Sequence, residues 1–265
     1  MSALTTVLVT RPEREAGPWV QALQAEGVQA EAFALIEIAP LPDVQALQSA
    51  WQLVPQCFAV MFVSANAVRF FMAAQPAGVA LHACRAWATG PGTQAALLAA
   101  GWPADHIDAP PADAQQFDSE ALWAVVSESA RAAKAQAQAQ ATVLIVRGAD
   151  ATGQLAGRDW LAQQIEDVGL KLAQTVAYVR RAPALSDAQQ ARAQQATHSG
   201  AWWLFSSSEA AVHLQQACPG LDVSTAQALA THPRIAERLR LSGWGRVHLV
   251  PASLKSQAES IKSLS

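Results

Sequence analysis

Short apolar runs alternate with amphipathic stretches along most of the chain, and this alternation predicts strands that are each followed by a helix. The run VLVTR at residues 7–11 precedes a stretch whose apolar positions recur at helical spacing as far as Gly27. The run VLIVR at residues 143–147 is followed in the same way by DWLAQQIEDVG at residues 159–169. In both places a buried strand leads into a helix that a glycine ends. Strands that alternate with helices favour parallel sheets covered on both faces.

The same order of segments occurs twice. VMFVSANAVRFF at residues 60–71 is echoed by WWLFSSSEAAVHL at residues 202–214. ATGPGTQAALLAAGW at residues 88–102 is echoed, 142 residues later, by ATHPRIAERLRLSGW. Self-similarity over this length indicates two units of one kind. We therefore expect an α/β fold with two similar lobes, each a parallel sheet flanked by helices.

Two long extended stretches, residues 30–41 and 171–183, could join these lobes. Each follows one copy of the first repeated segment. If the two stretches pair as a two-stranded β connector, the copy of the first repeated segment that precedes each stretch lies in one lobe, and the chain that follows crosses to the other lobe.

Helix starts that directly follow strands are the first candidates for a binding site. In open parallel sheets they lie at the carboxyl ends of the strands, where ligands bind. Unpaired backbone N–H groups and the positive end of the helix dipole can hold a carboxylate or a phosphate there. A single Ser or Thr at such a place is more simply interpreted as an ordinary helix cap, so only several starts that converge on one cleft favour an extended anion. The starts lie near Pro12, Ser64, Gly90, Gly157, Ser206 to Ser208, and Thr231 to Pro233.

Composition and charge leave few other classes open. The 265 residues are 51% hydrophobic and 15% charged, which is typical of a soluble globular protein with a sizeable core. The net charge of −3 gives no field that would attract nucleic acid or an anionic membrane. Cys57, Cys84 and Cys218 lack metal-ligand spacing and are best interpreted as reduced, buried thiols. Neither a signal peptide nor a membrane span is recognisable, so we expect a cytoplasmic protein.

Motifs of the common nucleotide, metal and serine enzymes are missing. The chain has no full GxGxxG after a strand, no GxxxxGK[ST], no HExxH and no GxSxG. Residues 90–95 fit the looser GxGxxA form, which is a weak signal for phosphate. Arg11 and Arg147 end equivalent strands, where each places a cation at a carboxyl edge or forms a surface salt bridge. Tyr178, the only tyrosine, lies in the second extended stretch; packing with its hydroxyl outward is the alternative to a chemical role.

Taken in order, these segments resemble the uroporphyrinogen-III synthase family along nearly the whole chain. The matching segments are VLVTRPERE, FVSANAV, ATGPGT with AALLAAGW, IVRG with GRDWL, VAYVRR, LFSSSEAAV and THPRIAE. Val63 departs from the family's threonine, and Thr89 from its small apolar residue. The resemblance implies a first lobe built from both chain ends, residues 1–35 and 182–265. It implies a second lobe at residues 42–173, and connector strands at residues 36–41 and 174–181.

The resemblance also implies an activity. The family's lyase reaction closes hydroxymethylbilane with loss of water and inversion of ring D, giving uroporphyrinogen III in haem biosynthesis. It implies a monomer that uses no metal and no cofactor and binds a linear tetrapyrrole. A transient contact with the enzyme that makes hydroxymethylbilane is a further expectation.

Tyr178 matches the family's catalytic candidate. Substrate carboxylates are expected at helix starts that match the family, and we add the two strand-end cations and the glycine of the looser motif. The predicted substrate contacts are Arg11, Ser64, Asn66, Thr89, Gly90, Thr93, Arg147, Ser207 and Thr231.

Two other functions use the same features without chemistry. One is a non-catalytic two-lobed binder of an anionic small molecule, and the other is a regulatory or scaffolding module that keeps the fold. The binder would use the helix starts but not Tyr178, and the module would have lost the chemistry of the cleft.

Overall fold

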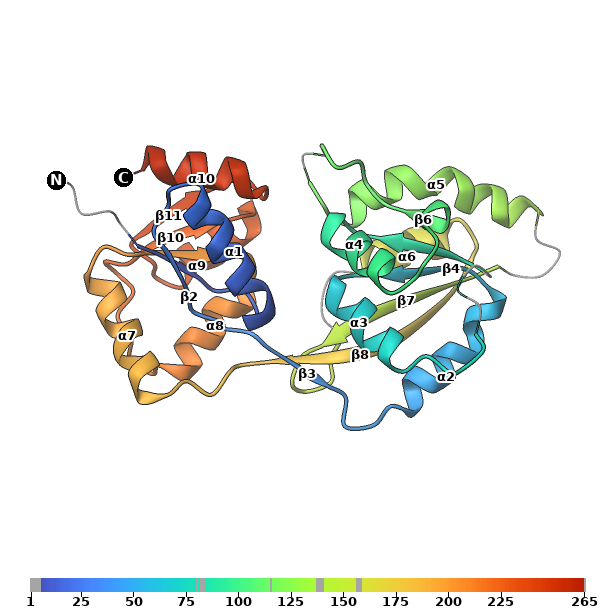
Figure 1. Cartoon of the computed structure of the whole chain (residues 1–265), viewed down its shortest axis with the longest axis horizontal. Helices are drawn as coiled ribbons and strands as arrows, with labels where there is room; N and C mark the ends of the chain where they lie inside the picture. Colours follow the sequence, from blue (N-terminus) through green and yellow to red (C-terminus); the bar gives the residue numbers. More distant parts are fainter. Residues whose placement is uncertain are drawn as a thin grey trace. The chain divides into compact units, whose positions relative to one another are not determined.

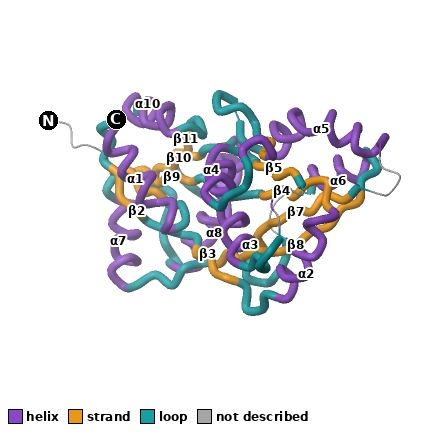
Figure 2. The backbone as a smooth tube through the Cα atoms, turned by 45° about the vertical axis from the view of Figure 1, so that its right-hand side comes forward, coloured by secondary structure: helices purple, strands orange, loops and turns teal. Residues whose placement is uncertain are grey.

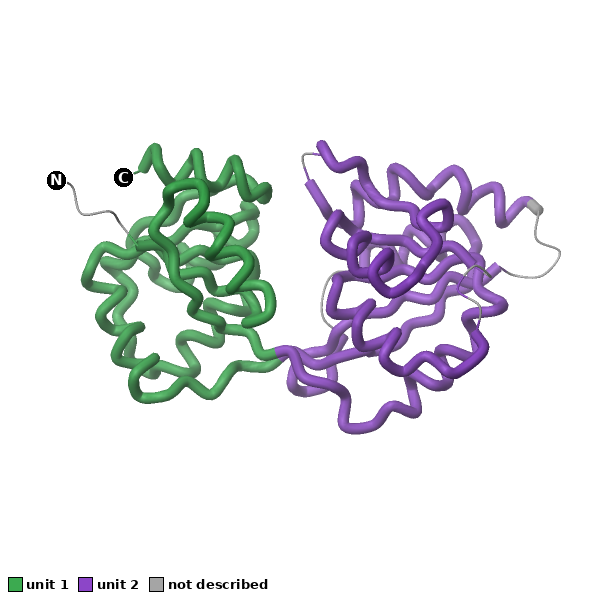
Figure 3. The backbone as a smooth tube through the Cα atoms, viewed as in Figure 1, with its two compact units in different colours: residues 1–37, 181–265 green, residues 38–180 purple. Residues whose placement is uncertain are grey.

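The computed structural model describes residues 6–79, 81, 84–114, 116–136, 141–155 and 159–264. The chain divides into two compact units, residues 1–37 with 181–265 and residues 38–180 (Figure 3). It leaves the first unit after Glu37 and returns at Arg181, whose guanidinium donates a hydrogen bond to the Glu37 carboxylate. The first unit therefore contains both ends of the chain.

The first unit holds a five-stranded sheet in the order β11-β10-β9-β1-β2, in which every pair is parallel. Apolar residues of α1 and α10, including Leu23 and Ile261, pack on the face that carries Trp202 and Leu204. Trp203 and Phe205 alternate with these and lie on the other face, where both contact Trp244. The strands are β1 (Val7–Val9), β2 (Ala30–Ala32), β9 (Trp202–Phe205), β10 (Gln227–Ala230) and β11 (Arg246–Leu249), and the helices are α1 (Glu13–Ala25), α7 (Asp187–His198), α8 (Ser208–Ala217), α9 (Pro233–Leu241) and α10 (Leu254–Ser263) (Figure 1).

The second unit holds a six-stranded sheet in the order β3-β8-β7-β4-β5-β6. Helices α2, α3 and α4 cover the face that carries Val60 and Phe62, and α5 and α6 cover the face that carries Ala59 and Met61. Figure 2 shows the strands running between these two groups of helices. The strands are β3 (Glu37–Pro40), β4 (Cys57–Phe62), β5 (Arg85–Ala88), β6 (Ile107–Asp108), β7 (Thr142–Ala149) and β8 (Lys171–Arg181). The helices are α2 (Gln45–Leu53), α3 (Ala65–Ala73), α4 (Pro91–Ala99), α5 (Ser119–Gln136) and α6 (Trp160–Asp167), with short 3-10 turns at Val54–Gln56 and Ala104–His106.

The two sequence repeats exchange their first segments. The order β6-β5-β4-β7-β8 in the second unit corresponds to β11-β10-β9-β1-β2 in the first. Strand β1, from the first repeat, therefore pairs with β9 of the second, and β7 pairs with β4 of the first. The predicted α/β class, with two parallel sheets flanked by helices, is confirmed.

The extended stretch at residues 30–41 contains two short strands, β2 and β3. Strand β2 belongs to the first sheet, and β3 lies beside β8 at the edge of the second. Residues 33–36 between them form no strand, since this is where the chain leaves one sheet for the other. The neighbouring strands β3 and β8 both lead to the chain crossings, as a two-stranded connector requires.

Repeated Gly-Trp pairs end two helices. Gly101 and Gly243 follow α4 and α9 with φ values of +86° and +82°, a conformation that glycine adopts without strain. Trp102 and Trp244 then turn back into the core. The helix start expected near Gly157 lies outside the described residues, and α6 begins after Asp159. The three cysteines are free and buried, as expected. Within the described ranges, no helix combines the length and apolar character that crossing a bilayer demands.

Candidate active site

Tyr178 lies near the carboxyl end of β8, where it opposes Gly148 of β7 across a one-residue shift in the strand register. Its side chain is only 3% exposed. The ring stacks on Phe70 of α3 with a centroid distance of 5.9 Å and an interplanar angle of 25°. A Cβ atom at Gly148 would lie 2.6 Å from the ring atoms Cε2 and Cζ. Phe70 and Gly148 therefore fix where the phenol lies.

Ser64 connects this phenol to a helix start. Its Oγ accepts a hydrogen bond from the Ala67 N–H at 3.1 Å and so caps α3. The same Oγ lies 3.1 Å from the Tyr178 hydroxyl. Two residues that are 114 positions apart in the sequence are thus brought into direct contact at the carboxyl edge of the second sheet.

Thr89 and Thr93 lie at the next strand end along this edge. Thr89 Oγ1 donates to the carbonyl oxygen of Val63 at 3.2 Å and lies 3.4 Å from Thr93 Oγ1. Gly90 caps α4, and a Cβ atom there would lie 2.9 Å from the Cβ of Phe117. Because Val63 directly precedes Ser64, the two threonines continue the polar edge that begins at Tyr178.

Asn66 lies in the first turn of α3 and is nearly buried. Its side-chain oxygen accepts a hydrogen bond from the Arg69 guanidinium. Sequence analysis did not select Arg69, although its spacing of three residues from Asn66 on a helix brings the two side chains together.

The two strand-end arginines bind their own units. Arg147 is 3% exposed and donates to Asp159 at 2.8 Å and to Gln174 at 2.9 Å. Gln174 lies two residues before Val176, the residue that Arg147 opposes, so this guanidinium reaches back along β8 and not toward the strand end.

Arg11 lies 3.9 Å above the Trp19 ring and 3.7 Å from the Glu15 carboxylate. Burial lowers the pKa of the Arg11 guanidinium, and Glu15 opposes that shift. Arg11, like Arg147, is thus paired within its own unit.

Ser207 and Thr231 occupy the equivalent edge of the first sheet. Ser207 caps α8 by accepting the Glu209 N–H at 3.2 Å. The backbone N–H of Thr231 donates to Phe205 at 3.1 Å. The side chain that caps α9 is His232, whose Nδ1 accepts the Arg234 N–H at 3.1 Å. His232 is therefore the capping residue of α9, and Thr231 lies between this cap and the end of β10.

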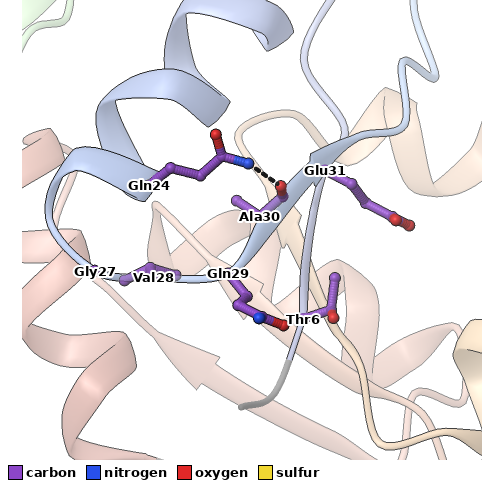
Figure 4. Close-up of a pocket in the computed structure, with 7 residues that line it drawn as sticks. All are labelled: Thr6, Gln24, Gly27, Val28, Gln29, Ala30 and Glu31. Atoms are coloured by element: carbon purple, nitrogen blue, oxygen red, sulfur yellow. Dashed lines mark hydrogen bonds between the residues drawn. The ribbon is translucent and has the colours of Figure 1, made fainter.

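Among the described residues, no group of three or more His, Cys, Asp or Glu side chains could hold a metal ion. A depression in the first unit, of about 510 Å³, lies at the amino ends of β1 and β2, away from Ser207 and Thr231. Two of its polar side chains are paired within the unit, since Gln24 donates to the carbonyl oxygen of Ala30 and Glu31 pairs with Arg192. It is lined by Thr6, Gln24, Gly27, Val28, Gln29, Ala30 and Glu31 (Figure 4).

The sequence did not indicate the two residues that hold the phenol ring. Phe70 lies in the repeated segment at residues 60–71, where it has the pattern of an ordinary core residue. Gly148 follows Arg147 at a strand end, and the equivalent position in the first repeat is Pro12. A glycine in one repeat where the other has a bulky residue is the only signal that could have singled it out.

Known proteins place this chain in a family. The family model described as uroporphyrinogen-III synthase HemD matches residues 17–257. A search of the curated proteins finds no match. The crystal structure of uroporphyrinogen-III synthetase from Helicobacter pylori is similar, with 16% identity and a TM-score of 0.63 over 98% of this chain and 100% of that one. A mutant uroporphyrinogen III synthase from Thermus thermophilus has 15% identity and a TM-score of 0.57 over 98% of both chains.

At these identities the solved structures show a common fold, whereas the family match rests on sequence. That match covers most of the chain. This chain therefore belongs to the uroporphyrinogen-III synthase family, the cyclising lyases of haem biosynthesis.

Proposed function

We propose that Tyr178 is the catalytic group with which this lyase closes hydroxymethylbilane to uroporphyrinogen III. The observation that carries the proposal is the fixed phenol at the carboxyl edge of the second sheet, 3.1 Å from the cap of α3. A phenol has an ordinary pKa of about 10, so it is protonated and able to donate at neutral pH.

In this reaction the phenol assists the loss of water. The bond between carbon and oxygen in the hydroxymethyl group on ring A breaks, its electron pair leaves with oxygen, and Tyr178 donates a proton to that oxygen. The pyrrole nitrogen supplies electrons to the remaining carbon, which becomes an azafulvene-like cation. The substituted carbon of ring D attacks this cation to form a spiro intermediate, and fragmentation followed by reclosure inverts ring D. A proton released as ring D regains its aromaticity returns to Tyr178, so water is the only by-product.

The substrate is a polyanion, while the chain has a net charge of −3. Backbone N–H groups at helix starts resolve this mismatch, because they bind carboxylates without adding formal charge. We propose carboxylate contacts at Asn66, Thr89, Gly90 and Thr93 of the second unit. Ser207, Thr231 and Arg11 supply further contacts from the first unit.

Arg147 has a different role in this proposal. Its buried guanidinium is committed to Asp159 and Gln174. It therefore holds β7 and β8 in register beside Tyr178 and contacts substrate at most through them.

The wider expectations complete the proposal. The pyrroles provide the electrons, so we infer that the enzyme works without a metal or cofactor. We also infer that it is a cytoplasmic monomer. Residues 1–35 with 182–265 and residues 42–173 act as its lobes, joined by residues 36–41 and 174–181. Because hydroxymethylbilane closes spontaneously to isomer I, a transient contact with the enzyme that produces it would shorten its exposure to water.

One assay tests the activity and separates it from mere binding. Hydroxymethylbilane is supplied to the purified chain, the products are oxidised, and the porphyrin isomers are separated. The proposal predicts isomer III in place of the isomer I that forms without protein. Isomer I at its spontaneous rate would instead identify a non-catalytic binder of anionic molecules.

A further inference from the structure

We propose that Ser64 is a positioning residue for this reaction, which donates its hydroxyl proton to the phenol oxygen of Tyr178 and so directs the phenol's own proton to the substrate. The inference rests on the proposed role of Tyr178. It deepens that role by naming what sets the direction of proton donation.

The ring contacts leave one freedom undetermined. Phe70 and Gly148 fix the plane and depth of the Tyr178 ring, and with them the position of its oxygen. They do not determine where the hydroxyl hydrogen points, because it rotates about the bond between carbon and oxygen. Ser64, at 3.1 Å, is a hydroxyl placed to set that rotation.

The helix start determines which hydroxyl donates. Ser64 Oγ already accepts the Ala67 N–H, and accepting a hydrogen bond makes a hydroxyl a stronger donor. The positive end of the α3 dipole has the same effect, because it stabilises negative charge on the Ser64 oxygen and so makes this hydroxyl a better donor. The Ala67 amide then donates to the Ser64 hydroxyl, and the Ser64 hydroxyl donates to the phenol of Tyr178. The phenol's proton is the last of this series and remains for the substrate.

The first unit shows what the same position does without a tyrosine. Ser207 takes the equivalent place at the start of α8 and accepts the Glu209 N–H at 3.2 Å. Tyr178 is the only tyrosine of the chain, so Ser207 has no phenol to orient. The hydrogen bond of Ser207 is thus a helix cap, whereas the second contact of Ser64 goes beyond capping.

A double-mutant cycle tests the proposal. The variants are Ser64→Ala, Ser64→Thr, Tyr178→Phe and the double Ser64→Ala/Tyr178→Phe, each measured for kcat and KM with hydroxymethylbilane. We expect kcat of Ser64→Ala to fall about tenfold with little change in KM, and Ser64→Thr to stay within about threefold of the wild type. The double variant should be no slower than Tyr178→Phe alone.

The matched control is Ser186→Ala. Ser186 caps α7 by accepting the Gln189 N–H at 3.3 Å, and it belongs to the first unit, whereas Tyr178 belongs to the second. Its loss removes a serine cap of the same kind and should leave kcat unchanged. A similar fall of kcat in Ser64→Ala and Ser186→Ala would reduce the role of Ser64 to helix capping and overturn the proposal.

A spectroscopic readout follows the hydrogen bond itself. Because the chain has one tyrosine, a labelled tyrosine ζ-carbon gives a single NMR signal, and its titration reports Tyr178 alone. A hydrogen bond donated to the phenol oxygen stabilises the phenolate, so Tyr178 should ionise at higher pH in Ser64→Ala than in the wild type or Ser64→Thr.

The outcomes separate the two proposals. A wild-type kcat in Tyr178→Phe refutes the role of Tyr178 and, with it, any positioning by Ser64. A slow Tyr178→Phe combined with multiplying losses in the double variant, or with an unshifted titration in Ser64→Ala, refutes the proposal for Ser64 alone.

Discussion

Replacing Gly148 by alanine perturbs the catalytic phenol without touching its chemistry. The added Cβ would lie 2.6 Å from Cε2 and Cζ of Tyr178 and 2.9 Å from its hydroxyl oxygen. Carbon atoms in contact pack at about 3.5–4.0 Å, so the ring has to retreat by about 1 Å. Phe70 stacks on the ring and the whole side chain is buried, which leaves little room for this movement.

Two magnitudes follow from this overlap. Overpacking of a buried site typically costs about 1–3 kcal/mol, so the free energy of unfolding should fall by that amount. A misplacement of about 1 Å at a reacting group can cost about 10²-fold in rate, so kcat should approach that of Tyr178→Phe. The measurements are urea unfolding and single-turnover formation of isomer III.

A second glycine provides the control. Gly17 lies inside α1, where an added Cβ meets no atom within 4 Å other than its chain neighbours and the backbone of its own helix. Gly17→Ala should therefore change the free energy of unfolding by less than about 1 kcal/mol, because the helix preference of alanine is opposed by crowding of its Cβ against the next residue, Pro18, and it should leave the rate unchanged. In a Tyr178→Ala background the methyl group at Gly148 should cost less than about 0.5 kcal/mol, since the colliding ring is gone. Wild-type stability and rate in Gly148→Ala would refute the close packing on which the reasoning depends.

Two further predictions concern buried groups away from the phenol. Arg147→Met should lower the free energy of unfolding by about 1.5–3 kcal/mol, because Gln174 loses a charged partner while Asp159, 75% exposed, regains water. A raised KM with unchanged urea unfolding would instead place Arg147 on the substrate. Burial raises the pKa of Cys57 to about 11, and burial with the nearby Cys57 raises the pKa of Cys84 to about 12. At neutral pH both thiols should alkylate at least about 10²-fold more slowly in the native than in the urea-unfolded chain, and equal rates would contradict this. These folded pKa values exceed the ordinary 9.0, so their contribution to stability is intact below pH 9 and is lost as pH rises through about 11 for Cys57 and about 12 for Cys84.

The architecture could be predicted because local sequence patterns determine its strands and helices. Apolar runs followed by amphipathic stretches indicate strands and helices one at a time, and their repetition indicates two similar sheets. Local pattern predicts residues 30–41 only as an extended stretch, since every residue there is compatible with extended backbone. Its division into β2 and β3 follows from the two separate sheets to which these strands belong.

The details of the site depend on side-chain direction, which local patterns do not carry. Arg147 lies near a strand end, where either a ligand contact or a salt bridge was expected, and the sequence does not indicate that its guanidinium reaches back to Gln174 on β8. The contact between Gly148 and Tyr178 needs the one-residue register shift between β7 and β8, which no spacing in either strand reveals. Ser64 was selected as a helix start, but its hydrogen bond to Tyr178 arises only when α3 and β8 are packed together.

The rate of Tyr178→Phe at saturating hydroxymethylbilane tests the central claim most directly. The phenylalanine ring keeps the packing against Phe70 and Gly148 and removes only the hydroxyl. The account predicts that isomer III forms about 10- to 100-fold more slowly than with the wild type, because water then leaves without a positioned donor. An unchanged rate of isomer III formation would contradict it.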